Sequence, residues 1–232
     1  MIGSVQAANS LLSVGVNFPD DTVGGTLAPA DVAGAVPQAN WNNGAAAGSG
    51  TLNNLIGDLG GNAVATGVSV SWSGSGNTWA STGRGEENNG FPAGGDRSLM
   101  TGYLDTSDTS TTTITFSGIP EPYASLGYDV LVYALGGVAG RGGIYTIGST
   151  ALSLTSAASP TAHILDPGVD LNDSGTYGQF QVSGTSFTLT ATAVGGNVRA
   201  PINGIQIVER IPEPAAASLA AFAGLALLRR RR

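Results

Sequence analysis

Cysteine and lysine are absent from this chain of 232 residues, and histidine occurs once, as His163. Without cysteine the protein has no disulfide scaffold, no thiolate metal site and no cysteine nucleophile. A P-loop requires a lysine, so the glycine-rich run at residues 136–142 is predicted to connect two strands and not to cradle a phosphate. One histidine is too few for a histidine-based zinc site.

Charge is also scarce, because only 11% of the residues are charged. Four of the nine arginines are the last four residues, so residues 1–228 carry sixteen acidic side chains against five arginines, a formal charge of −11. An acidic body with no basic stripe argues against nucleic acid as a partner. Acidity and sparse charge suit a secreted protein with weak interactions, although other soluble proteins are acidic as well.

The sequence offers no evident catalytic constellation. A Ser–His–Asp triad would have to use His163, yet no Gly-x-Ser-x-Gly motif accompanies it, and its neighbours Ile164 and Leu165 favour a structural role. Most acidic residues stand beside Gly, Asn or Pro, where aspartate hydrogen-bonds the backbone of turns. We therefore predict that the protein is not an enzyme. A secreted glycan-active enzyme remains an alternative, because paired carboxylates meet in space and not in sequence.

Glycine, serine, threonine and alanine dominate the body, asparagine is also abundant, and the chain has thirty-six glycines in all. Gly and Asn favour turns, whereas Thr and Val favour strands. Short alternating segments recur with turn residues between them and no convincing helix, which is typical of an antiparallel β-sandwich. We predict one all-β domain over residues 11–210.

Several segments are predicted to be strands or strand pairs. The clearest single strands are Leu12–Phe18, Val64–Trp72, Tyr128–Leu135 and Pro201–Val208. Residues 144–147 and 152–155 are predicted to form a hairpin, and residues 177–182 to pair with residues 187–191 through a three-residue turn. Thr51–Leu59 is compatible with a short helix or a strand.

The closing segment Asn203-Gly204-Ile205-Gln206-Ile207 resembles the last strand of jelly-roll, galactose-binding-like domains. The opening segment Val14–Phe18 and the central segment Gly127–Val130 also resemble segments of such domains. This likeness implies a jelly-roll form of the sandwich, although a fold does not define a function.

The C-terminal end has a composition unlike the rest of the chain. Pro212-Glu213-Pro214 precedes an apolar run of fourteen residues, Ala215–Leu228, and four arginines close the chain. The run includes Ala215, Leu219, Phe222, Leu225 and Leu228. As a helix it would reach about 21 Å, short of the roughly 30 Å hydrocarbon core of a bilayer. The cluster Arg229, Arg230, Arg231 and Arg232 would remain on the cytoplasmic side. A helix docked on the domain or an unstructured tail is the alternative.

Motif, apolar run and arginine cluster, in this order at residues 211–232, resemble the PEP-CTERM sorting signal of Gram-negative bacteria. The resemblance implies recognition by an exosortase, a membrane protease that is thought to cleave near the Pro-Glu-Pro motif. It also implies a transient stay in the inner membrane, followed by delivery to the cell surface or extracellular matrix. The internal Pro120-Glu121-Pro122 lacks a following apolar run, so it is not a second signal.

An exported protein needs a signal peptide, and Met1–Ser4 supplies neither a basic nor an apolar region. Val5-Gln6-Ala7 nevertheless fits the small-x-Ala rule for a cleavage site. Residues 1–10 are therefore predicted to be a flexible remnant of an export signal whose start lies upstream.

Three interpretations of the body remain open. It is a structural protein associated with extracellular polysaccharide, or a carbohydrate-binding module in which Trp41, Trp72 and Trp79 form a stacking platform; for Trp41 a plug in the core is the favoured interpretation. An ice-binding protein is the third interpretation; only an alternative label of the resembled C-terminal domain suggests it, and the Ser/Thr-rich stretch 109–115 is not a regular array in sequence. No cofactor is expected. The acidic loop at residues 81–98 leaves a structural Ca²⁺ as an option, although a solvated loop with local ion pairs is favoured.

Overall fold

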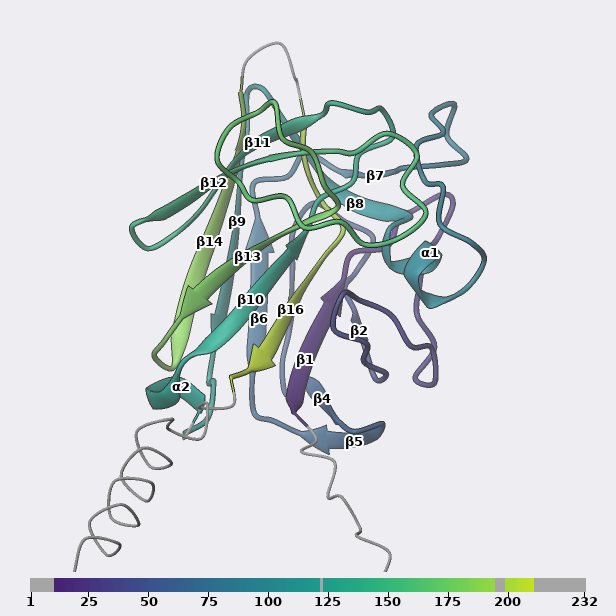
Figure 1. The fold of residues 1–232 in the computed structure, drawn as a ribbon. Coiled ribbons are helices and arrows are strands. Elements are labelled where there is room, and N and C mark those ends of the chain that lie inside the picture. Colours follow the sequence, from purple (N-terminus) through teal and green to yellow (C-terminus); the bar gives the residue numbers. More distant parts are fainter. Residues whose placement is uncertain (1–10, 122, 195–198, 211–232) are drawn as a thin grey trace, which may run out of the picture.

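The computed structural model describes residues 11–121, 123–194 and 199–210, which form a β-sandwich. The predicted all-β class is confirmed: within these residues sixteen strands are arranged in three sheets (Figure 1). The features predicted for residues 1–10 and 211–232 lie outside the described residues.

The first large sheet contains both the first and the last strand of the domain. Its order is β13 (Tyr177–Val182), β10 (Tyr128–Tyr133), β16 (Gly204–Glu209), β1 (Leu12–Asn17), β4 (Ile56–Leu59) and β5 (Asn62–Ala65), with β2 (Asn42–Asn43) paired to β1. The predicted strand Tyr128–Leu135 is thus an inner strand of this sheet.

The second large sheet has six strands. Its order is β12 (Thr150–Thr155), β11 (Gly142–Ile147), β14 (Ser186–Ala193), β9 (Thr111–Ser117), β6 (Ser69–Ser73) and β3 (Gly50–Leu52). β11 and β12 form the predicted hairpin, with Ile147 opposite Thr150. A small third sheet, β15 (Arg199–Ile202), β8 (Gly102–Ser107) and β7 (Thr78–Ala80), lies at one end of the sandwich (Figure 1).

Two short helices, α1 (Gly95–Leu99) and α2 (Tyr123–Leu126), correct the expectation that the body has no helix. Thr51–Leu59, left open between helix and strand, contains the end of β3 and all of β4.

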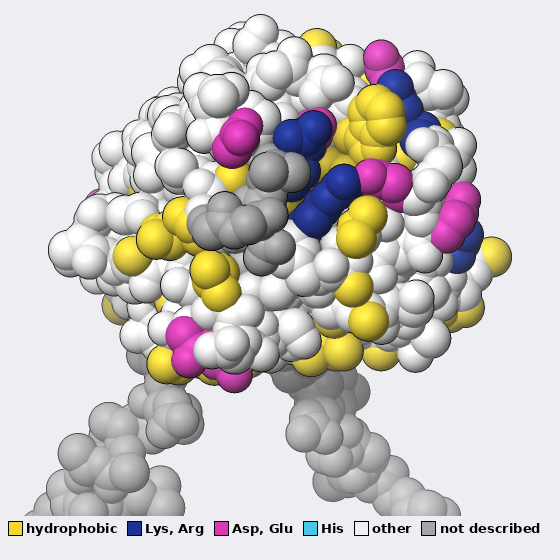
Figure 2. Space-filling view, turned by 90° about the horizontal axis from the view of Figure 1, so that it is seen from above, with side chains coloured by type: hydrophobic (Ala, Val, Ile, Leu, Met, Phe, Trp, Pro, Cys, Tyr) yellow, Lys and Arg dark blue, Asp and Glu magenta, His cyan; other side chains and the backbone are white. Residues whose placement is uncertain are grey.

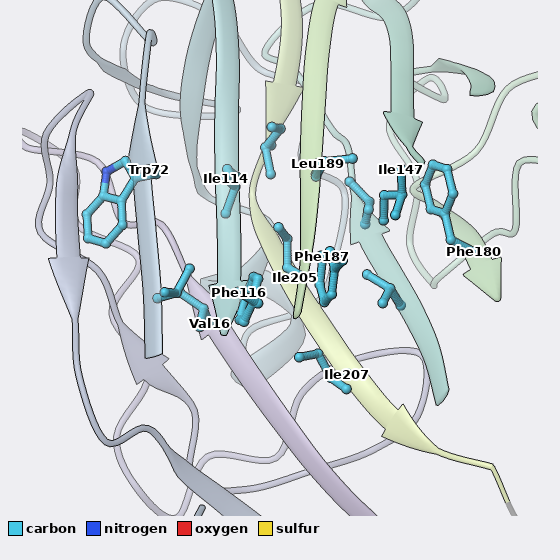
Figure 3. Close-up of a cluster of buried hydrophobic side chains, with 14 of the residues drawn as sticks. Val16, Trp72, Ile114, Phe116, Ile147, Phe180, Phe187, Leu189, Ile205 and Ile207 are labelled. Carbon is cyan, nitrogen blue, oxygen red and sulfur yellow. The ribbon is translucent and has the colours of Figure 1, made fainter. Parts of the chain in front are cut away.

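The main core lies between the two large sheets. Alternate residues of each strand point inward, as the period of two along a strand requires. Figure 3 shows side chains of both sheets meeting in this space, among them Val16 and Ile205 from one sheet and Ile114 and Leu189 from the other. Each of these four side chains is buried.

A second, smaller core covers the outer face of the seven-stranded sheet. Leu131, Tyr133 and Val208 point away from the main core and contact a layer that contains Leu99 and Trp41. Trp41 packs so close to β1 that a Cβ atom on Gly15 would lie 2.5 Å from its ring. The position between Val14 and Val16 is therefore restricted to glycine by this contact.

Two predicted strands are each broken in two. Val64–Trp72 is split between β5 and β6, which belong to different sheets, because Gly67 adopts a φ of +73° and turns the chain. Pro201–Val208 is split at Asn203 between β15 and β16. The Asn203 side chain at this break is fully buried. Its Nδ2 donates to the Gly102 carbonyl at 2.9 Å, and its Oδ1 accepts from the Leu135 N–H at 2.6 Å.

The predicted pairing of residues 177–182 with residues 187–191 is wrong. β13 pairs with β10, whereas β14 pairs with β9 and β11 in the opposite sheet. The turn between them, which includes Gly184 at a φ of +95°, therefore carries the chain from one layer to the other.

Candidate polar pocket at one end of the sandwich

A polar pocket of about 130 Å³ opens at the end that carries the small third sheet. Its lining combines both charge signs with one aromatic ring: Asn77, Trp79, Glu86, Asp105, Arg141 and Arg199. In the view from above, arginine and acidic side chains gather near the middle of this end (Figure 2).

One wall of the pocket is an ion pair between Arg141 and Glu86. The guanidinium donates two hydrogen bonds to the carboxylate, Nη2 to Oε1 at 2.6 Å and Nη1 to Oε2 at 2.5 Å. Nη1 also donates to the Tyr103 hydroxyl at 3.2 Å. A Cβ atom on Gly137 would lie 2.2 Å from Glu86 Oε2, so the glycine-rich loop before Arg141 provides the space for this pair.

The opposite charges of Asp105 and Arg199 meet in the same pocket. Arg199 Nε lies 2.8 Å from Asp105 Oδ1, and the aspartate side chain is only 8% exposed. Burial raises the pKa of Asp105, and the neighbouring Arg199 and Arg141 offset this effect only in part. β8 supplies Asp105 and β15 supplies Arg199, and these strands pair directly.

The aromatic side of the pocket is Trp79, which is half-buried on β7. The Arg84 guanidinium lies 3.8 Å from the ring centroid, a cation–π contact. The same guanidinium contacts Asp20 and Asp21, each at 2.7 Å. Arg84 is thus fixed over one face of Trp79 by two carboxylates from the loop after β1.

The other two tryptophans of the predicted platform are not available to a ligand. Trp72 is 3% exposed in the main core, with its ring edge-on to Phe18 and its indole N–H donating to the Ala47 carbonyl at 3.0 Å. Trp41 is 5% exposed, which agrees with a plug, although it closes the outer face of the large sheet. The three-tryptophan platform is therefore wrong, and Trp79 alone remains near the surface.

The acidic loop at residues 81–98 disperses its carboxylates among separate partners. Glu86 pairs with Arg141, Glu87 accepts from the Gly83 N–H at 2.8 Å, and Asp96 accepts from the Gly34 N–H at 2.8 Å. The sequence predicted ion pairs within the loop. In the structure the ion pairs instead join the loop to residues far away in the chain. In the part of the chain that the structure describes, no group of three or more His, Asp or Glu side chains is arranged to hold a metal ion.

His163 is packed among aromatic rings on the outer face of the seven-stranded sheet. Its Nε2 lies 2.9 Å from Asp96 Oδ1, and its ring contacts Phe91, Tyr133 and Tyr177. Its Nδ1 is buried with no hydrogen-bond partner among the described residues. This environment agrees with the structural role predicted from sequence.

The pocket can recognise a small neutral polar group. Its two carboxylates are each held by an arginine, so the lining offers fixed donors and acceptors beside an aromatic ring without a large net charge. Sequence reasoning identified Trp79 but missed Asp105, Arg141 and Arg199, because long-range pairs bring them together. The pair Gly136-Gly137, shortly before Arg141, was the one local feature of the sequence that pointed to this pocket.

Comparison of the chain with protein-family models, with curated proteins and with solved structures finds no match. Among the described residues, neither helix has the length and apolar character needed to cross a membrane.

Proposed function

We propose that this protein is exported and sorted to the cell surface or extracellular matrix of a Gram-negative bacterium, where its sandwich domain is a structural protein associated with exopolysaccharide. The observation that carries the proposal is the C-terminal order of Pro212-Glu213-Pro214, an apolar run and four arginines. An exosortase is the transient partner, and the inner membrane is the transient location.

The positions of the two chain ends support this proposal. Ser13 lies opposite Val208 in the pair β1–β16, so both ends of the described domain leave at one end of the sandwich. Strands β7 and β8, which supply Trp79 and Asp105 to the polar pocket, lie toward the other end, beyond the point where Asn17 pairs with Gly204 (Figure 1). A domain tethered through its C-terminus would therefore present the pocket away from the membrane.

The sorting proposal is tested by replacing Pro212, Glu213 and Pro214 with alanine in the full-length protein. We expect the variant to accumulate in the inner membrane, as shown by fractionation and immunoblotting of the native host. The matched control replaces the internal Pro120, Glu121 and Pro122, which should leave delivery unchanged. Normal surface delivery of the C-terminal variant would refute the assignment.

A carbohydrate-binding module of the jelly-roll type is the second candidate, and the pocket favours it. A half-buried tryptophan beside fixed carboxylate and guanidinium groups offers both stacking and hydrogen bonds to a sugar ring. Catalysis is not part of this proposal, because Glu86 and Asp105 are each engaged by an arginine.

Trp79→Ala tests this second candidate by calorimetry against neutral and uronate-containing polysaccharides. If the pocket binds a sugar unit against the Trp79 ring, the affinity should fall about tenfold or more, because aromatic anchors supply much of the binding energy of a site. Tyr123→Ala, a half-buried aromatic in α2, is the matched control and should bind normally. Equal binding by both variants, or no binding by the native protein, would reject the candidate.

A further inference from the structure

The outer face of the six-stranded sheet is covered by hydroxyl groups. Every second residue from Ser69 to Ser73 on β6, from Thr111 to Ser117 on β9 and from Ser186 to Thr192 on β14 is serine or threonine. These residues point away from the core, whereas the alternate residues, such as Phe116 and Leu189, are buried. We name the outward residues of these three strands the hydroxyl face.

Strand register aligns these hydroxyls in rows across the sheet. One row runs through Ser71, Thr115 and Thr188, and the next through Ser73, Thr113 and Thr190. Thr115 Oγ1 lies 3.0 Å from Thr188 Oγ1. The rows repeat at about 4.8 Å from strand to strand and about 6.7 Å along each strand. The stretch 109–115 looked irregular in sequence because Thr112 turns inward and is buried, where its hydroxyl bonds that of Thr106.

The hydroxyl face is exposed, whereas the outer face of the seven-stranded sheet is covered by other parts of the chain. The seven-stranded sheet carries a second core, in which Leu131 and Tyr133 lie beneath the layer containing Trp41. By contrast, the outward residues Thr111, Ser117, Ser186, Thr188 and Thr192 are exposed. None of the outward positions of β6, β9 and β14 is charged or aromatic.

The chemistry of this face restricts the kind of partner that it suits. A charged partner finds no opposite charge, and a flexible sugar chain finds no aromatic ring on which to stack. One hydroxyl contact only exchanges a hydrogen bond with water for another, so it contributes little by itself. A partner that is already ordered loses little conformational entropy on binding, so many such contacts can add together.

From this geometry we propose that the hydroxyl face binds the surface of ice. Ice is rigid, neutral and periodic, and its water molecules both donate and accept hydrogen bonds, as the Ser and Thr hydroxyls do. Adjacent strands twist by about 20–25°, so the match is most regular between directly paired strands, and β9 and β14 are paired over a longer stretch than β6 and β9. These two strands alone hold eight aligned hydroxyls.

The proposal is tested on the full-length protein by partitioning into a slowly growing ice crystal, with inhibition of ice recrystallisation as a second measurement. Thr113→Tyr combined with Thr190→Tyr places two rings in the middle of the face. Tyrosine is favoured in strands, so the fold should persist, which thermal unfolding will verify. Gln181→Tyr, at an exposed position of β13 on the other sheet, is the matched control.

The native protein and the Gln181 variant should be enriched in the ice fraction, whereas the double variant should be excluded like an ordinary solute. Exclusion of the native protein from ice would overturn the proposal. So would equal enrichment of the native protein and a folded double variant. Parallel pull-downs use insoluble crystalline cellulose and chitin: retention there without enrichment in ice would assign the face to a polysaccharide surface instead. All of these outcomes are independent of the sorting proposal.

Discussion

Asp20 shows how a single buried carboxylate organises the pocket end of the domain. Its side chain accepts hydrogen bonds from the backbone of Val23 at 2.6 Å and Thr22 at 2.9 Å and pairs with Arg84 at 2.7 Å. Burial alone would raise its pKa, but these hydrogen bonds and the arginine outweigh burial, so the pKa of Asp20 is lowered. The carboxylate in turn holds Arg84 against Trp79.

This lowered pKa predicts a pH-dependent effect of Asp20→Asn. The stabilising contribution of Asp20 is fully present above the pKa of an unfolded aspartate, near 3.8, and is lost as the pH falls through the lower folded value. We expect the variant to lose about 2 kcal/mol of unfolding free energy at pH 7, and the difference from the native protein to shrink below pH 4. Urea denaturation at several pH values measures this change.

The exposed residue Asp108 provides the control, because Asp108→Asn should change stability little at any of these pH values. If Asp20→Asn lowered the unfolding free energy by the same amount at every pH down to 2, the role given to the charged carboxylate would be contradicted.

At the scale of elements, the sequence predicted strand segments more reliably than their ends and partners. Alternating residues in β1 and in the β11–β12 hairpin, and the apolar run of β10, made these strands predictable from the sequence. Alternation carries no information about which sheet a strand joins. For this reason β5 and β6, which continue one pattern across Gly67, were taken for one strand, and β13 and β14 for a pair.

The turn at Gly67 allows a test of this explanation. Its φ of +73° is unfavourable for a side chain, yet a Cβ atom there would meet no atom within 4 Å, so backbone strain acts alone. We expect Gly67→Ala to lower the unfolding free energy by about 1 kcal/mol. Gly76→Ala, also in open space but outside the positive-φ region, should be neutral or slightly stabilising.

Equal effects of the two glycine substitutions in a denaturation experiment would show that φ at Gly67 does not decide where β5 ends and β6 begins.

At the scale of the whole molecule, the sandwich class followed from composition and turn spacing, whereas the candidate sites did not. The polar pocket assembles Trp79, Asp105, Arg141 and Arg199 from four strands or loops, and the hydroxyl face depends on the register of three strands. Both are products of long-range pairing that no local pattern encodes. Burial of Trp72 likewise became evident only from packing, whereas burial of Trp41 was already favoured by the sequence.

The arrangement of the whole domain connects these sites with the proposed sorting. Both chain ends leave opposite the polar pocket, so removal of the C-terminal tail would free the protein without altering the pocket or the hydroxyl face. This connection makes the fate of the last residues the central question about the protein.

The most direct measurement is the intact mass of the protein recovered from the cell surface or medium of its host. Sorting by an exosortase predicts a C-terminus near Pro212-Glu213-Pro214, so the apolar run and Arg229–Arg232 should be missing. A released protein whose mass still includes Arg232 would contradict the proposed processing.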